Sequence, residues 1–137
     1  MVDYWIREAQ RWLEDAEEDL KVAEDLIKLN HFAASCFHSQ QSAEKAVKAA
    51  LYAYGVEARG HSIRELLKKL EDVSNTDVSK LVDDARLLDK HYAPPRYPNL
   101  HPGISAPAYS LYGRGDAETC LKAAKNVLNF VKNLLKL

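Results

Sequence analysis

Hydrophobic residues recur every three or four positions along the first half of the chain, the spacing of one face of an α-helix. They do so without a break over residues 5–27, and Asp3 stands where an N-cap is expected. The positions between them are rich in Asp and Glu, which predicts a solvent-exposed face. A second pattern covers 32–54 and ends before Gly55, a common C-terminal cap. Because Asn30 interrupts the pattern only briefly, the two helices are expected to pack as antiparallel neighbours.

Three shorter patterns of the same period follow, and each is preceded by a residue that can cap a helix. No stretch alternates with the period of two that marks a β-strand. The predicted caps and apolar ranges are Ser62 with Glu65 for 62–70, Thr76 or Asp77 for 78–88, and Asp116 for 117–135. The pattern therefore predicts an all-α fold, an up-and-down bundle of four or five helices with a long Pro-rich loop before the last helix. Residues 1–137 are expected to form a single domain.

The first predicted helix is long for a chain of this size. About 25 residues extend about 38 Å at the helical rise, whereas a compact chain of 137 residues has a radius of gyration of about 14 Å. Helices this long, with wide apolar stripes, leave surface for a partner. A homodimer is the simplest assembly that covers it.

Composition limits the binding partners and the cell compartment that can be expected for the protein. A formal net charge of -1 argues against a broad basic surface and allows only a short contact with nucleic acid. No apolar run approaches the ~18 residues that a membrane-spanning helix needs, so no membrane segment is expected. Cys36 and Cys120 lack the Cys/His spacing of a zinc site and are predicted to be reduced thiols. The chain is accordingly expected to be cytoplasmic, with no metal and no cofactor.

Tyr92 to Gly115 differs in composition from the rest of the chain. It holds all five prolines, three of the five glycines and four of the seven tyrosines, and it has two arginines but no acidic residue. A loop of this length inside a compact domain is usually functional or disordered. Its seven large apolar side chains argue against disorder. We therefore expect this loop to carry the function and to favour an anion.

Arg96 and His101 are the candidate catalytic residues of this loop. An Arg side chain grips a phosphate through two contacts, and a His side chain exchanges protons near neutral pH. Tyr97 and Asn99 are candidates for base stacking or hydrogen bonding to a substrate. Lys45 and Lys48, on the second helix, are further candidates for substrate binding. An Arg and a His at this spacing in a loop can also be incidental, and the sequence contains no phosphate-binding Gly-rich loop and no di-metal carboxylate motif.

Nearly the whole chain resembles the HEPN family of small helical domains, in the compact stand-alone form found in bacteria and archaea. The resemblance rests on AEEDLKVAEDLI at 16–27, FAASCFHSQQSAEKAVKAAL at 32–51, HSIRELL at 61–67 and the Arg96-Tyr97-Pro98 step followed by an Ala-rich last helix. It implies a helical bundle that dimerises. In many members an Arg-x(4 to 6)-His motif forms a metal-independent RNase site shared across the dimer, and Arg96 and His101, with four residues between them, fit that motif.

The resemblance also implies a partner. Stand-alone members are often encoded beside a small nucleotidyltransferase and are regarded as toxins or as nucleotide-binding subunits of a two-component system. The chain departs from catalytic members at Tyr97, where Asn, Asp or His usually follows the Arg, and at Gly103, where some members have a Tyr. The sequence therefore leaves two alternative functions open. One is RNA cleavage through the ribose 2′-hydroxyl, with His101 as acid or base and Arg96 on the phosphate. The other is non-catalytic binding of a nucleotide or a partner.

Overall fold

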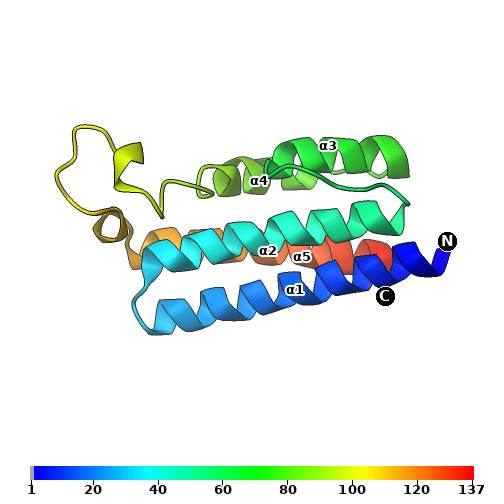
Figure 1. Ribbon diagram of the computed structural model, residues 1–137, viewed down its shortest axis with the longest axis horizontal. Helices are drawn as coiled ribbons and strands as arrows, with labels where there is room; N and C mark the ends of the chain where they lie inside the picture. The colour runs from blue at the N-terminus through cyan, green and yellow to red at the C-terminus, as the bar shows by residue number, and fades with distance from the viewer. Residues whose placement is uncertain (1) are drawn as a thin grey trace.

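The computed structural model describes residues 2–137, and these residues form helices and connecting segments with no β-strand (Figure 1). The α-helices are α1 (Val2–Lys28), α2 (Phe32–Ala53), α3 (Ile63–Ser74), α4 (Val82–Asp89) and α5 (Arg114–Leu135), and the 3-10 helices are η1 (Ser79–Leu81), η2 (Pro98–Leu100) and η3 (Ala108–Leu111). The predicted all-α bundle is confirmed. No helix among the described residues is both long enough and apolar enough to cross a bilayer.

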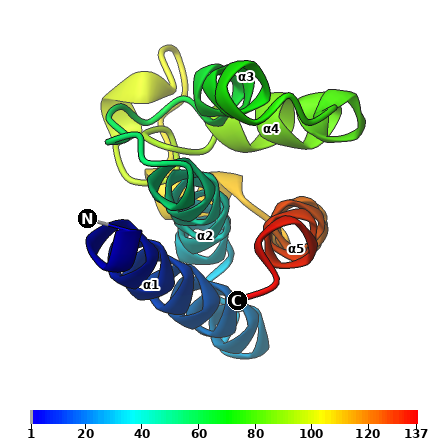
Figure 2. The same ribbon diagram turned by 90° about the vertical axis from the view of Figure 1, so that its right-hand side faces the viewer.

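The helix α2 is the centre of the bundle. Figure 2 shows α1 and α5 on two of its sides and the α3–α4 pair on a third. Fifteen of its 22 residues are buried, most of them Ala or Ser. These small side chains let α1 approach closely, and two buried hydroxyls bond directly to α1 carbonyls, Ser35 Oγ to Ala23 O at 2.8 Å and Ser42 Oγ to Ala16 O at 2.7 Å.

The connection between α1 and α2 is as tight as predicted. Asn30 adopts a φ of 64°, a left-handed conformation that Asn tolerates better than most residues. The chain thereby reverses within three residues, and α1 and α2 run antiparallel (Figure 1). Asp3, however, already lies inside α1 and is a first-turn acid rather than the N-cap. The expectation for Asp3 was wrong because the helix extends further back than the apolar pattern.

The caps of the later helices agree only in part with expectation. Ser62 is the N-cap of α3, and its side chain accepts a hydrogen bond from Glu65 N at 3.2 Å, as predicted. The expected cap of the fourth helix at Thr76 or Asp77 was wrong, because the 3-10 turn η1 intervenes and α4 begins only at Val82, with Leu81 as its N-cap. Asp77 instead precedes η1, and its Oδ1 accepts from Ser79 N at 2.9 Å. Asp116 lies inside α5, and its carboxylate reaches back to accept from the N-cap Gly113 N at 2.8 Å.

The segment from 92 to 113, called the 92–113 loop below, joins α4 to α5. It lies at the end of the bundle that also carries the α1–α2 turn, opposite both chain termini (Figure 1). The η2 and η3 turns give it local order, with His101 N bonded to Pro98 O at 3.0 Å and Ser110 N to Pro107 O at 3.1 Å. The prolines fix φ and suit such turns while preventing a longer helix.

Candidate functional site

The guanidinium of Arg96 lies among three aromatic rings at the start of the 92–113 loop. Its Cζ atom is 4.3 Å from the ring centroid of Phe37, 4.7 Å from that of Tyr92 and 5.1 Å from that of Tyr97. Its Nε donates to Tyr92 O at 2.9 Å. Among residues 2–137, no hydrogen bond engages its two terminal nitrogens, Nη1 and Nη2. The side chain is therefore oriented by stacking and by one bond while its fork stays free for an acceptor.

The ring of His101 is held in one tautomer. Its Nε2 lies 2.7 Å from Pro94 O, and since a carbonyl oxygen only accepts, Nε2 carries the hydrogen. In the neutral ring Nδ1 is then the unprotonated nitrogen. The ring also packs edge-on against Tyr112, with centroids 6.1 Å apart. His101 is half-buried and is thus a positioned imidazole with a free acceptor.

Arg96 and His101 are placed separately within one chain. Each bonds to a backbone carbonyl of the same turn, and they pack on different aromatic residues, Arg96 toward α2 and His101 toward the start of α5. Tyr97 and Asn99, the candidate substrate contacts, are both exposed beside them. Of these candidates only Tyr97 contacts Arg96, so the shared phosphate contact and the substrate roles stay predictions.

A polar network under the loop was not anticipated from the sequence. The His61 ring stacks on Tyr92, with centroids 4.4 Å apart and planes inclined by 20°. His61 Nδ1 lies 3.2 Å from Glu44 Oε1, and Gln40 Nε2 donates to both Glu44 and His61 O. This network supports Tyr92, which in turn contacts Arg96. One feature of the sequence could have revealed this network. Polar residues recur at 40, 44 and 48, a spacing of four that puts them on one face of an otherwise Ala-rich helix.

The two candidate lysines of α2 are paired with acids in this structure. Lys48 is 6% exposed. Its Nζ atom lies 3.1 Å from Glu44 Oε2 and 5.4 Å from the centroid of the Trp12 ring. Lys45 Nζ lies 2.8 Å from Asp19 Oδ2. A phosphate that bound either lysine would have to compete with a carboxylate. Their assignment to substrate binding stays a prediction.

Three side chains that the sequence spacing did not connect meet beside the loop. Cys36, His91 and Cys120 offer ligating atoms that all lie within 4.8 Å of one another. The nearby Cys36 thiol and His91 ring outweigh burial and lower the pKa of the Cys120 thiol. The same contact raises the pKa of Cys36. Because Cys36 and Cys120 are 0% and 1% exposed, neither can attack a substrate in solution.

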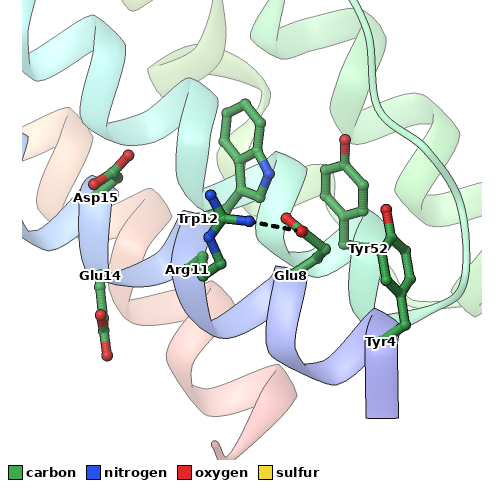
Figure 3. A pocket seen from close by; sticks show the side chains of 7 residues that line it. All are labelled: Tyr4, Glu8, Arg11, Trp12, Glu14, Asp15 and Tyr52. Atoms are coloured by element: carbon green, nitrogen blue, oxygen red, sulfur yellow. Dashed lines mark hydrogen bonds and ion pairs between the residues drawn. The ribbon is translucent and has the colours of Figure 1, made fainter. Parts of the chain in front are cut away.

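The chain has a separate pocket along α1, shown in Figure 3. Its volume is about 440 Å³, and the lining residues are Tyr4, Glu8, Arg11, Trp12, Glu14, Asp15 and Tyr52. Trp12 and Tyr52 stack with centroids 5.7 Å apart, while Arg11 is paired with Glu8 at 2.8 Å. Three acids against one arginine make this pocket unsuited to a phosphate. An anionic ligand is better accommodated by the 92–113 loop, which has no acidic residue.

Comparison with known proteins gives a consistent result. The family model of the HEPN domain matches residues 9–134. The chain is 39% identical over 137 residues to a Methanocaldococcus jannaschii protein named "Putative toxin MJ1304", a match that covers 96% of this chain and 90% of that protein.

Solved structures agree with the family match. TT1696 from Thermus thermophilus is 42% identical with a TM-score of 0.86, and the match covers 92% of this chain and 97% of that one. ST0689, described as an archaeal HEPN homologue, is 36% identical with a TM-score of 0.77, covering 93% and 98%.

Proposed function

This chain belongs to the HEPN domain family, and from that premise we propose that it is a toxin-type ribonuclease that cleaves RNA without a catalytic metal ion. Arg96 and His101 act on the substrate, in a cleft between two copies of the chain. The proposal rests on which nitrogen atoms of these two side chains are hydrogen-bonded and which are free. His101 is held with its Nδ1 free to accept a proton, and Arg96 is held with both terminal nitrogens free.

The chemistry follows from these groups. His101 Nδ1 accepts the proton of a ribose 2′-hydroxyl, the 2′-oxygen attacks the adjacent phosphorus, and the bond from phosphorus to the 5′-oxygen breaks. The leaving 5′-oxygen takes a proton from Nδ1 of His101 of the partner subunit, which enters the step as the doubly protonated imidazolium, so one ring gains the proton that the other loses. The products are a 2′,3′-cyclic phosphate and a 5′-hydroxyl. DNA is not cleaved because it lacks the nucleophile.

Arg96 stabilises the negative charge that builds on the phosphate during the attack. The stack of Phe37, Tyr92 and Tyr97 keeps the guanidinium in place before the substrate arrives, so little conformational entropy is lost on binding. The remaining loop residues favour a single-stranded substrate. Tyr97 is 47% exposed and offers a ring face to a base.

A dimer resolves the separation of the two groups within one chain. Arg96 and His101 point to different neighbours, so two copies with their loops facing each other would pair Arg96 of one subunit with His101 of the other. Exposed apolar side chains on the same loop favour such contact, among them Leu100 at 42% and Ile104 at 54% exposed.

The test is cleavage of a fluorescent single-stranded RNA by the purified chain in buffer with EDTA. We expect cyclic-phosphate products, a rate loss of about 10²-fold or more for Arg96→Ala, and a loss of about 10² to 10⁴-fold for His101→Ala. Arg96→Lys should recover only part of the rate, because a lysine lacks the fork.

Arg7→Ala is the matched control. Arg7 also donates from Nε to a carbonyl four residues earlier, at 3.3 Å, but it belongs to the first turns of α1, which begins at the opposite end of the bundle from the loop. Its loss should leave the rate unchanged. Equal rates for the Arg96→Ala and Arg7→Ala variants, or cleavage of a DNA analogue, would contradict the proposal.

The same divergence of Arg96 and His101 favours a second candidate function. A stacked guanidinium beside an exposed tyrosine can hold a nucleotide without cutting RNA, as in a partner subunit of a small nucleotidyltransferase. In that case the wild-type chain degrades no RNA at any concentration and calorimetry detects binding of ATP that Arg96→Ala abolishes. The two functions are therefore separated by one pair of measurements.

A further inference from the structure

The only two cysteines of the sequence meet at one point, although they lie far apart along the chain. Cys36 lies near the start of α2, Cys120 lies near the start of α5, and His91 follows the end of α4. The two Sγ atoms and a ring nitrogen of His91 all lie within 4.8 Å of one another. Both thiols are buried and His91 is half-buried. Neither the fold of the bundle nor the proposed RNA chemistry requires this convergence.

The histidine is oriented as a metal ligand would be. Its Nδ1 lies 2.9 Å from Leu87 O, so Nδ1 carries a hydrogen and Nε2 is the nitrogen left for the cluster. A hydrogen bond from the outer ring nitrogen to a backbone carbonyl is the usual way that proteins fix the tautomer of a ligating histidine. The two cysteines sit on long helices, and His91 lies in the turn just after α4, where its bond to Leu87 O holds the ring in place.

We propose that Cys36, His91 and Cys120 bind one thiophilic d¹⁰ cation, Zn²⁺ or Cu⁺, when the chain is reduced. Thiolate and imidazole are the ligands that both ions prefer. With metal–sulfur bonds of about 2.3 Å and metal–nitrogen bonds of about 2.0 Å, neighbouring ligand atoms lie about 3.5–3.8 Å apart, so only a small contraction of the cluster is needed. Any proton still held by a thiol or by His91 Nε2 passes to solvent as the ion binds.

The two ions differ in what else they require. Cu⁺ is satisfied by three ligands, whereas Zn²⁺ takes a fourth, for which a water can enter past the half-buried His91. Two thiolates balance the charge of Zn²⁺ and leave one negative charge with Cu⁺. The same three ligands suit both ions, and the titrations described below distinguish Zn²⁺ from Cu⁺.

The ion would clamp the base of the 92–113 loop. His91 immediately precedes the loop, and Cys120 lies in the helix that follows it. Tyr112 packs between this cluster and the candidate site, with its ring centroid 5.7 Å from His91 and 6.1 Å from His101. The site is structural and contacts no substrate, so it is independent of the proposed RNA cleavage.

The test uses the full-length chain, reduced and stripped of metal. Zn²⁺ is titrated against a chromophoric chelator, and Cu⁺ is titrated without oxygen against a chelator specific for it. We expect one ion per chain in at least one arm, and the arm with the tighter binding identifies the ion. Cys36→Ser and Cys120→Ser should each weaken binding by about a hundredfold or more, and His91→Gln by about tenfold or more. The control His31→Gln changes an exposed histidine and should have no effect.

A second measurement needs no variant and therefore does not depend on how the variants fold. Co²⁺ added to the reduced wild-type chain should give the intense charge-transfer absorption of thiolate bound to cobalt. The absence of this band together with no one-to-one binding of Cu⁺, or tight binding that survives Cys36→Ser, would overturn the proposal. The proposal would also be overturned if the reduced chain bound neither ion and its two thiols formed a disulfide on mild oxidation. None of these readouts involves RNA, so this proposal and the proposed ribonuclease function fail separately.

Discussion

At the scale of single residues, the buried polar groups of α2 other than the Ser39 hydroxyl are satisfied by partners on other elements as well as on their own helix. Glu44 is 4% exposed and is contacted by Lys48, Gln40 and His61. Asp19 on α1 receives His38 at 3.0 Å and Lys45 at 2.8 Å from α2. Such groups cost stability unless they are paired, so each pair between helices also fixes how those helices are aligned.

Asp19→Asn tests one of these pairs through pH. Burial alone would raise the pKa of Asp19, but hydrogen bonds and charges from His38 and Lys45 outweigh burial and lower it. A lowered pKa stabilises the folded chain at pH above the ordinary carboxyl value, and that contribution is lost as the pH falls through the folded-state pKa. We expect Asp19→Asn to lower the free energy of unfolding by about 1–2 kcal/mol at pH 7. The difference from wild type should shrink below about pH 4.

Urea unfolding at a series of pH values measures this difference. Asp15→Asn is the control, because Asp15 is exposed on the same helix. A difference at Asp19 that stayed constant down to the most acidic buffer would show that packing, not charge, is responsible.

At the scale of elements, the short helices stabilise each other's ends. Asp89 is the last residue of α4, yet its carboxylate accepts from Ile63 N at 2.6 Å, from Arg64 N at 3.2 Å and from Ser62 Oγ at 3.1 Å, at the start of α3. A carboxylate at a helix N-terminus also complements the helix dipole. The α3–α4 pair therefore depends on a cap supplied by a residue that is distant in sequence.

Asp89→Ala should lower the free energy of unfolding by about 1–2 kcal/mol, the usual cost of losing an N-cap. Asp89→Asn should cost less, since one amide oxygen can still accept from the α3 backbone. Thermal unfolding followed by circular dichroism measures both. Asp83→Ala removes an exposed carboxylate from the first turn of the same helix, together with its surface pair to Arg86, and should lower the midpoint much less than Asp89→Ala. An equal loss at both positions would refute the capping role.

At the scale of the whole molecule, the exposed apolar surface is unevenly distributed. Among the described residues, four of the ten exposed large hydrophobic side chains lie on the 92–113 loop, with Tyr109 at 74% the most exposed of them. The loop lies at one end of the bundle, so it can face a second copy without hindrance from the termini (Figure 1). Several exposed apolar side chains on one loop are typical of an interaction surface.

Replacing Ile104 and Tyr109 with Lys should therefore convert a dimer into monomers, with the dissociation constant of the dimer raised by about tenfold or more. Sedimentation equilibrium of the wild-type and variant chains measures the shift. Val73→Lys is the control, since Val73 is 41% exposed but lies on α3, away from the loop. A wild-type chain that is monomeric at micromolar concentration, or a dimer that survives both loop substitutions, would contradict the dimeric cleft.

Much of the fold was predictable from periodicity and capping chemistry, because both act between residues close in sequence. The helices, the tight α1–α2 turn and the Ser62 cap follow from such local rules. The start of α4 was not predictable in this way, because Asp77 accepts a hydrogen bond from a 3-10 turn whose stability depends on neighbouring elements. Arg96 and His101 were predictable as candidates because loop composition and spacing are local properties too.

The sequence by itself determined the helical content, the family resemblance and the segment that carries the candidate site. Only the tertiary structure decided which tautomer His101 adopts, which rings hold Arg96, and that Cys36, His91 and Cys120 meet. The physical reason is that these contacts join residues brought together by helix packing. Their distances depend on how α2, α4 and α5 are aligned, and no local pattern encodes that alignment.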